Sequence, residues 1–165
     1  MKKIKAKQQN SPGSFTVAIA VSLFNENITS ALLAGTLERL KARGVYLDDI
    51  TIVEVPGAIE LPLIIQQLAQ LKQHKVIIAL GAVIRGDTTH YEYVCQQASQ
   101  GCQKVSLDFN LPVVFGLLTT ENEAQAWERL GGAHGHKGID AANCAVDMYQ
   151  ICSQIQLLKN LNPLT

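Results

Sequence analysis

Residues 76–91 read VIIALGAVIRGDTTHY, and this stretch decides the fold of the chain. Its first five residues, 76–80, form an unbroken aliphatic run, which is typical of a strand buried on both faces of a parallel sheet. A glycine-containing loop follows, and from His90 onward apolar residues recur at helical spacing. Strand, loop and helix in this order predict one unit of an α/β domain.

The segments on either side repeat the alternation of strand and helix. Further strands are predicted at 16–21, 50–55 and 113–118. The runs 76–80 and 113–118 are expected at the centre of the sheet, because they are almost purely apolar. The pattern therefore predicts an α/β fold, a three-layer αβα sandwich with a central parallel four-stranded sheet of the flavodoxin-like type.

Helical periodicity fills the segments between the predicted strands. The expected helices run from about 25 to 44, 57 to 71, 90 to 108, 120 to 127 and 138 to 155. Asn25 is predicted to begin the first helix, and Gly44 to end it. Thr120 to Glu123 have the Thr-x-x-Glu form of a capping box, which predicts a helix start at Thr120.

Length and charge restrict the functional classes. The 165 residues fit one domain, expected at 15–160, between an N-terminal tail, 1–14, and a C-terminal tail, 161–165. The chain carries 14 basic and 14 acidic side chains, so nothing favours a nucleic-acid partner. No run reaches the ~20 apolar residues of a membrane span, and no secretory signal is present, so we expect a cytoplasmic protein.

Lysines and cysteines offer two secondary signals. The N-terminal tail contains Lys2, Lys3, Lys5 and Lys7. They could form a phosphate-seeking arm, but so short a run is more often a mobile, solvated tail. The cysteines are Cys95, Cys102, Cys144 and Cys152. They form no CxxC pair and fall in apolar helical patterns, which predicts reduced, buried thiols.

Ligands of open α/β sheets bind beyond the carboxyl ends of the strands, so residues there are candidate site residues. Phe24 follows the first strand and could stack on a planar heterocycle, although a core position is commoner for phenylalanine. Glu60 follows a Pro56-Gly57 turn, where it could face a ligand or simply favour the start of a helix.

The third strand leads to the most informative segment. Asp87, Thr88 and Thr89 precede a helix, so backbone N–H groups and hydroxyls there are expected to bind a phosphate. His90 lies beside them, and an imidazole transfers protons near neutral pH. An isolated histidine is usually structural or merely exposed. Here we give a catalytic role and this non-catalytic interpretation about equal weight.

Basic side chains near the end of the chain extend this set. Arg129 could form paired hydrogen bonds with phosphate oxygens, or could be a solvated arginine at a helix end. His134 and His136 lie in the glycine-rich loop 131–138. No carboxylate or cysteine stands at ligand spacing from them, so we expect no metal site.

Several strings together resemble the lumazine synthase family over about residues 15–155. The specific ones are 85–91, RGDTTHY, and 115–122, FGLLTTEN. Weaker ones follow in the same order: Phe24-Asn25, Pro56 to Glu60, Glu128-Arg129 and Lys137-Gly138. The chain departs from the common family pattern at Leu23 and in the loop 133–136.

The resemblance implies an activity. It implies a transferase that condenses 5-amino-6-(D-ribitylamino)uracil with 3,4-dihydroxy-2-butanone 4-phosphate to give 6,7-dimethyl-8-ribityllumazine, phosphate and water, the penultimate step of riboflavin biosynthesis. No cofactor is implied. His90 would be the proton shuttle. The pyrimidinedione and ribityl groups would contact Phe24, Ala58, Ile59, Glu60, Val83, Ile84, Phe115 and Lys137. The phosphate would contact Gly86, Asp87, Thr88, Thr89 and Arg129.

The resemblance also implies an assembly. A neighbouring subunit would deliver Phe115, Arg129 and Lys137, within a homopentamer or an icosahedral assembly of pentamers, and association with riboflavin synthase is allowed. Two other interpretations stay open. The chain could be a non-catalytic binder of flavin or of a phosphorylated metabolite on the same scaffold, or a structural shell subunit without activity.

Overall fold

Four parallel strands form the sheet at the centre of the computed structural model, which describes residues 3–6 and 13–161. The strands are β1 (Val17–Ser22), β2 (Ile50–Val55), β3 (Val76–Ile84) and β4 (Val113–Thr120). Their order across the sheet is β2-β1-β3-β4, and Val17 of β1 pairs with Ile50 and Val76 on its two sides. This is a flavodoxin-like order, so the predicted sheet is confirmed.

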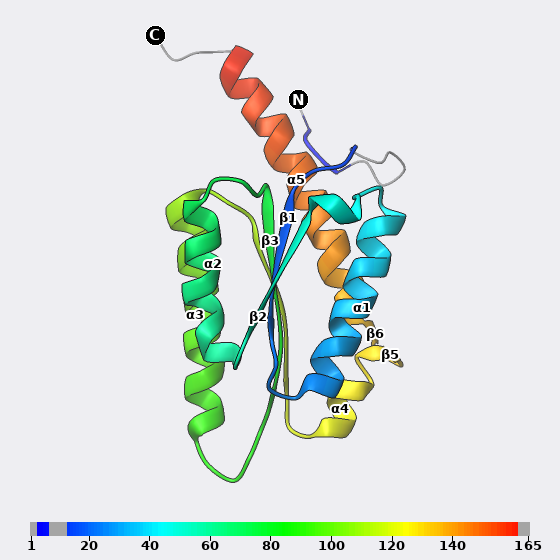
Figure 1. Ribbon diagram of the computed structural model, residues 1–165, viewed down its shortest axis with the longest axis vertical. Coiled ribbons are helices and arrows are strands. Elements are labelled where there is room, and N and C mark those ends of the chain that lie inside the picture. The colour runs from blue at the N-terminus through cyan, green and yellow to red at the C-terminus, as the bar shows by residue number, and fades with distance from the viewer. Residues whose placement is uncertain (1–2, 7–12, 162–165) are drawn as a thin grey trace.

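Helices cover both faces of the sheet (Figure 1). Their bounds are α1 (Glu26–Ala42), α2 (Leu61–Gln70), α3 (His90–Phe109), α4 (Glu123–Trp127) and α5 (Lys137–Leu161), with short 3-10 turns η1 (Leu47–Asp49) and η2 (Ala58–Glu60). One apolar core lies between the sheet and the α2–α3 layer, and a second lies between the sheet and the α1–α5 layer. The predicted three-layer sandwich is therefore confirmed.

The prediction that 113–118 lies at the centre of the sheet is wrong. β4 is an edge strand, and the two inner strands are β1 and β3. Two residues of β4, Phe115 and Thr119, are exposed, and Phe115 is 41% exposed. An apolar run alone does not separate an inner strand from an edge strand, because periodicity carries no information about strand order. An exposed apolar edge is normally covered by another part of the protein or by another chain.

Strand ends and helix caps differ in detail from the sequence-based expectations. β3 continues to Ile84, four residues beyond the predicted end, so its last residues are strand rather than loop. The capping box predicted at Thr120 is wrong, because β4 still includes this residue. Asn122 caps α4 instead, and its Oδ1 accepts a hydrogen bond from the backbone N–H of Gln125 at 2.9 Å. Gly44, with φ of 88°, follows α1 as predicted.

The predicted glycine-rich break contains a small hairpin. Its strands are β5 (Leu130–Gly132) and β6 (Gly135–His136), which pair antiparallel beside α1 (Figure 1). All four cysteines are free, but only Cys102 is buried, and Cys144 is exposed. The prediction of buried thiols is therefore wrong for Cys144, which lines a cavity between β4 and α5.

The ends of the chain are described in part. The backbone oxygen of Lys5 accepts a hydrogen bond of 3.1 Å from Nε2 of Gln154, so residues 3–6 lie against α5. Lys2, Lys7 and residues 162–165 lie outside the described residues. The domain bounds 15–160 stay a prediction. Within the described residues, no helix combines the length and the apolar character that a bilayer crossing requires.

Candidate active site

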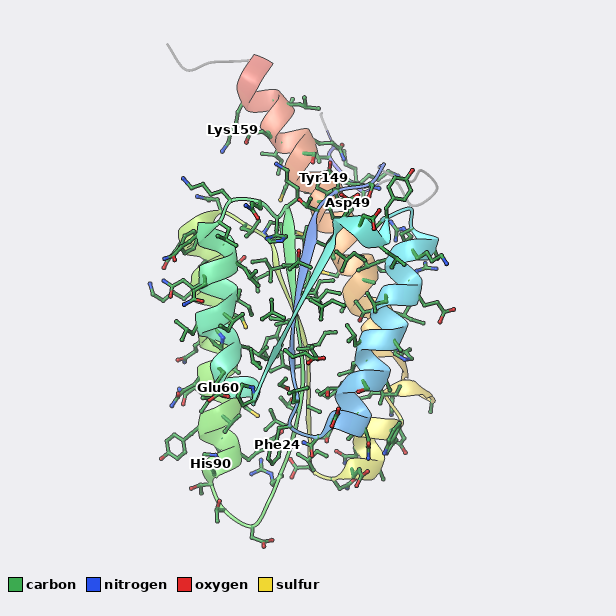
Figure 2. The ribbon with its side chains drawn as sticks, in the orientation of Figure 1. Phe24, Asp49, Glu60, His90, Tyr149 and Lys159 are labelled. Carbon is green, nitrogen blue, oxygen red and sulfur yellow. The ribbon has the colours of Figure 1, made fainter. Side chains whose placement is uncertain are left out.

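A cavity of about 510 Å³ lies beyond the carboxyl ends of β1, β2 and β3. Figure 2 shows Phe24, Glu60 and His90 at this same end of the sheet. Nine of the sequence-predicted residues line the cavity, namely Phe24, Ala58, Ile59, Glu60, Val83, Ile84, Gly86, Thr88 and His90. Parallel strands bring these positions together because their carboxyl ends all meet at one edge of the fold.

Phe24 is held at the mouth of the cavity by its backbone. Its N–H donates to the backbone oxygen of Pro56 at 3.1 Å, which ties the end of β1 to the end of β2. Asn25 then adopts a left-handed conformation, with φ of 61°, and its Nδ2 donates to the backbone oxygen of Ala82 at 2.9 Å. The Phe24 side chain is 70% exposed, so the alternative of a core phenylalanine is wrong. Its ring is free to stack on a planar ligand.

The turn 86–89 joins β3 to α3. Gly86 and Thr88 line the cavity, whereas Asp87 and Thr89 are exposed and are not among its lining residues. Thr89 occupies the N-cap position without a side-chain cap, and Oγ1 of Thr88 accepts a long hydrogen bond of 3.4 Å from the N–H of His90. The positive end of the α3 dipole thus points at this turn, which suits an anion.

His90 begins α3 and is exposed at the cavity. Its imidazole is therefore neither packed into the core nor shielded from a ligand. An accessible imidazole next to an anion-binding turn is suited to proton transfer to or from a bound phosphate ester. His90 and Phe24 line the same cavity.

Arg85 is the cation nearest in sequence to the turn, and carboxylates engage it on two sides. Its Nη1 lies 2.7 Å from Oε1 of Glu92, and its Nε lies 2.6 Å from Oε2 of Glu121. Its guanidinium carbon also lies 4.2 Å from the centre of the Tyr91 ring. The hydrogen bonds to Glu92 and Glu121 raise the pKa of Arg85. These two acids balance the charge of Arg85.

The sequence-based set missed Tyr91 and Val94, which line the cavity beside His90. Burial raises the pKa of the Tyr91 hydroxyl. Both residues lie in the first turns of α3. Their proximity to His90 in sequence was the available signal.

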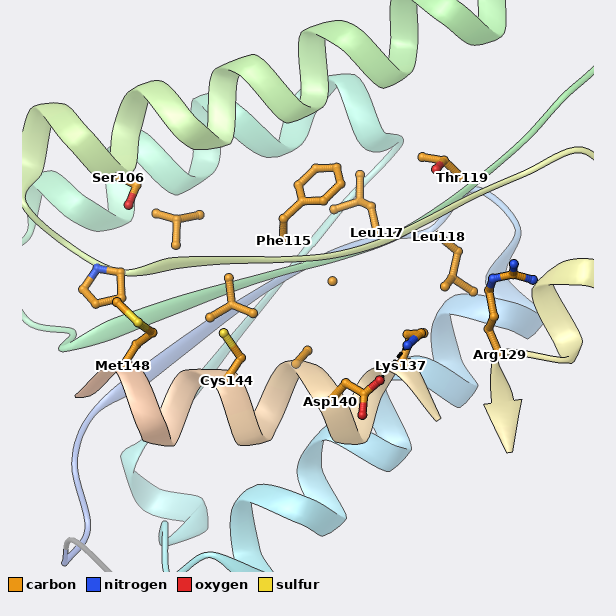
Figure 3. Close-up of a pocket in the computed structure, with 15 residues that line it drawn as sticks. Ser106, Phe115, Leu117, Leu118, Thr119, Arg129, Lys137, Asp140, Cys144 and Met148 are labelled. Atoms are coloured by element: carbon orange, nitrogen blue, oxygen red, sulfur yellow. Dashed lines mark hydrogen bonds and ion pairs between the residues drawn. The ribbon is translucent and has the colours of Figure 1, made fainter. Parts of the chain in front are cut away.

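Three predicted residues lie elsewhere. Phe115, Arg129 and Lys137 line a second cavity of about 550 Å³ along β4 and α5 (Figure 3). Nη1 of Arg129 donates to the backbone oxygen of Gln125 at 2.7 Å, and Nζ of Lys137 lies 2.8 Å from Oδ2 of Asp140. The two cavities share no lining residue. Within one chain, these three side chains therefore line a different cavity from that of His90.

The chain is similar to known proteins over nearly all of its length. Residues 14–153 match the family model of 6,7-dimethyl-8-ribityllumazine synthase. A 6,7-dimethyl-8-ribityllumazine synthase of Coxiella burnetii (strain RSA 493 / Nine Mile phase I) is 49% identical over 144 residues, which are 87% of this chain and 95% of that protein. One of Protochlamydia amoebophila (strain UWE25) is 44% identical over 160 residues, 97% of this chain and 92% of that protein. The chain therefore belongs to the 6,7-dimethyl-8-ribityllumazine synthase family.

Proposed function

We propose that the chain is a transferase that condenses 5-amino-6-(D-ribitylamino)uracil with 3,4-dihydroxy-2-butanone 4-phosphate. The products are 6,7-dimethyl-8-ribityllumazine, phosphate and water. The observation that carries the proposal is the cavity in which an exposed aromatic ring, an accessible imidazole and the start of a long helix meet. Family membership supports the identity of the two substrates.

The chemistry asks little of the protein beyond placement and proton transfer. The 5-amino group of the pyrimidinedione attacks the ketone to give an imine with loss of one water, and phosphate is then eliminated. The ribitylamino nitrogen attacks the carbonyl that this elimination generates, and the ring closes with loss of a second water. Holding the two reactants in contact supplies much of the acceleration, because it replaces a bimolecular encounter by a local one. His90 carries protons between the attacking amine and the departing groups. No step calls for a cofactor.

Each substrate has its own part of the cavity. The Phe24 ring stacks on the pyrimidinedione, and Val83 and Ile84 at the end of β3 form an apolar wall for it. Ala58, Ile59 and Glu60 in the η2 turn face the ribityl chain, and the Glu60 carboxylate can accept hydrogen bonds from its hydroxyls. The phosphate occupies the turn at Gly86 and Thr88, with Asp87 and Thr89 contributing backbone N–H groups.

A neighbouring copy completes this site in a homopentamer or an assembly of pentamers. Two observations support this arrangement. Phe115, Arg129 and Lys137 line a separate cavity at the edge strand β4, where a second chain can cover the exposed apolar side chains. Arg85, the cation nearest in sequence to the turn, is already balanced by two acids, so Arg129 of another copy supplies the positive charge for the phosphate. Phe115 and Lys137 complete the pyrimidinedione site.

The cellular setting follows the same proposal. Four free thiols fit the reducing cytoplasm, and riboflavin synthase, which would consume the product, is a possible partner. Residues 15–160 form the single catalytic domain.

The formation of fluorescent lumazine from the two substrates tests the proposal. The purified chain should accelerate the reaction over the uncatalysed condensation. His90→Ala should lower kcat by about 100-fold or more, since general acid–base catalysis supplies at least that much. Arg129→Ala should raise the KM for the keto-phosphate about 10- to 150-fold. This factor corresponds to the binding energy of a hydrogen bond between charged groups. His134→Ala, at an exposed histidine of the hairpin tip, is the matched control.

Failure of the unaltered chain to exceed the uncatalysed rate would overturn the proposed reaction. Tight retention of a flavin without product formation would instead favour a binding protein on the same scaffold.

A further inference from the structure

The hairpin formed by β5 and β6 links the two cations of the second cavity. Arg129 immediately precedes Leu130, the first residue of β5, and Lys137 immediately follows His136, the last residue of β6. Leu130 pairs with His136, and the N–H of Lys137 donates to the backbone oxygen of Arg129 at 2.8 Å. The placement of this hairpin therefore sets the positions of both basic side chains together.

The imidazole of His136 packs into a notch on α1. Gly35 forms the notch, since a Cβ built on it would lie 2.6 Å from Nε2 and 2.7 Å from Nδ1 of His136. Such a Cβ would overlap the ring, so no larger residue fits there while His136 keeps its place. Glycine inside a helix costs about 1 kcal/mol relative to alanine. Gly35 lies well inside the 17-residue helix α1, where glycine is otherwise unfavourable.

A hydrogen bond fixes the orientation of the ring. The N–H of Gly138 donates to Nδ1 of His136 at 3.2 Å, which requires Nδ1 to be unprotonated. Gly138 itself lies against α1, where a Cβ on it would come within 3.0 Å of Oγ1 of Thr36. Oγ1 of Thr36 is in turn 3.1 Å from the backbone oxygen of Gly138. The end of the hairpin and the start of α5 are thus attached to α1 at one point.

His134 on the same hairpin behaves differently. Its side chain is 58% exposed, and its Nε2 lies 4.0 Å from Oε2 of Glu128. Among the described residues, no three histidine, cysteine, aspartate or glutamate side chains lie together as metal ligands would. The side chain of His134 is therefore solvated, whereas that of His136 is docked on α1.

We propose that His136 is a positioning residue for catalysis. Its imidazole, held in the notch at Gly35, fixes the β5–β6 hairpin so that Arg129 and Lys137 present their charges to the substrate site. This inference rests on the proposed function, because these two side chains matter there as substrate contacts. His136 itself does not touch a substrate in this arrangement, and it acts through the hairpin.

Four variants test the inference by steady-state kinetics with both substrates, in the intact assembly. Gly35→Ala should displace the ring and raise the KM for the keto-phosphate roughly 10- to 100-fold, because a shift of about 1 Å can cost that much. His136→Asn keeps an acceptor for the Gly138 N–H but is too short to fill the notch, so its KM should rise less. The double variant Gly35→Ala/His136→Asn should recover most of the loss. His134→Asn should match the unaltered chain.

The recovery separates positioning from a general loss of folding. A double variant no better than Gly35→Ala, or a Gly35→Ala chain with unchanged KM, would overturn the inference. If Gly35→Ala does not fold, His136→Ala takes its place, and it should raise the KM with unchanged oligomer mass and Tm. An unchanged KM in His136→Ala would count equally against positioning.

A second readout does not depend on turnover. Hydrogen exchange of the backbone amides at 130–138 should be faster in His136→Ala than in His134→Asn, because the hairpin loses its anchor. Equal exchange in the two variants would overturn the inference. Absence of turnover in the unaltered chain would instead overturn the proposed function, so the two failures are distinguishable.

Discussion

Two phenylalanines of this chain should respond in opposite ways to the same substitution. The Phe24 side chain is 70% exposed and lines the candidate active site. Phe15 is 5% exposed, and its ring stacks on Tyr149 with 3.9 Å between the ring centres. Phe24→Ala should therefore weaken substrate binding and leave the fold intact. Phe15→Ala should destabilise the fold and leave substrate binding nearly unchanged.

The expected sizes follow from these surroundings. Stacking of an aromatic ring on a planar ligand contributes about 0.5–1.5 kcal/mol in addition to the burial of its apolar surface. Loss of the Phe24 ring should therefore raise the KM for the pyrimidinedione about 2- to 13-fold. Because most of that ring is in solvent, its removal should change the free energy of unfolding by less than about 0.5 kcal/mol. Removal of a buried phenylalanine such as Phe15 typically costs about 3–5 kcal/mol.

Lumazine formation at a saturating keto-phosphate concentration measures the first effect, and denaturant unfolding measures the second. The unaltered chain is the reference for both variants. An unchanged KM for the pyrimidinedione in Phe24→Ala would refute the stacking role. A loss of stability as large as that of Phe15→Ala would show that Phe24 is a packing residue after all.

Three further substitutions or reagents probe the charges and thiols. Glu121→Gln removes a carboxylate that pairs with Arg85, which leaves more positive charge for an anion. Inorganic phosphate should therefore inhibit at a concentration about 2- to 5-fold lower. An unchanged inhibition constant would show that Arg85 does not reach the anion. Burial raises the pKa of the Cys102 thiol to about 11, so iodoacetamide at pH 8 should modify Cys102 only after denaturation. Detection of labelled Cys102 in the native protein by mass spectrometry would contradict this. Burial lowers the pKa of His74 from 6.5, so below about pH 6.5 the unfolded state takes up a proton that the folded state resists. The free energy of unfolding should therefore fall as the pH drops, and His74→Gln should reduce the slope of this fall; identical slopes would exclude His74 as a cause.

Local patterns predicted most of the fold. Apolar runs and helical spacing are set by neighbouring residues, so the strands and the main helices were placed within a few residues of their observed positions. Strand order is not local, and β4 was wrongly placed at the centre of the sheet. The start of α4 was also misplaced, because Thr120 and Asn122 both favour a cap and the extent of β4 decides between them.

The candidate site could be predicted in part for the same reason. Residues that directly follow strands, such as Phe24 and Gly86, lie in the cavity because the topology takes them there. The pairing of Arg85 with Glu121 joins positions 36 residues apart, and no sequence period indicates it. The contact between His136 and Gly35 depends on how the hairpin packs on α1, so the sequence showed two histidines but not their different surroundings.

Mixed assemblies test most directly whether two copies of the chain share each site. His90→Ala and Arg129→Ala chains would be co-expressed with different tags and purified through both. Activity would be measured at a keto-phosphate concentration well below KM, where each variant alone should be nearly inactive. If one copy supplies His90 and its neighbour supplies Arg129, about one quarter of the sites in a random mixture keep both groups, so about one quarter of the unaltered activity should return. Activity no higher than that of the separate variants would contradict a shared site.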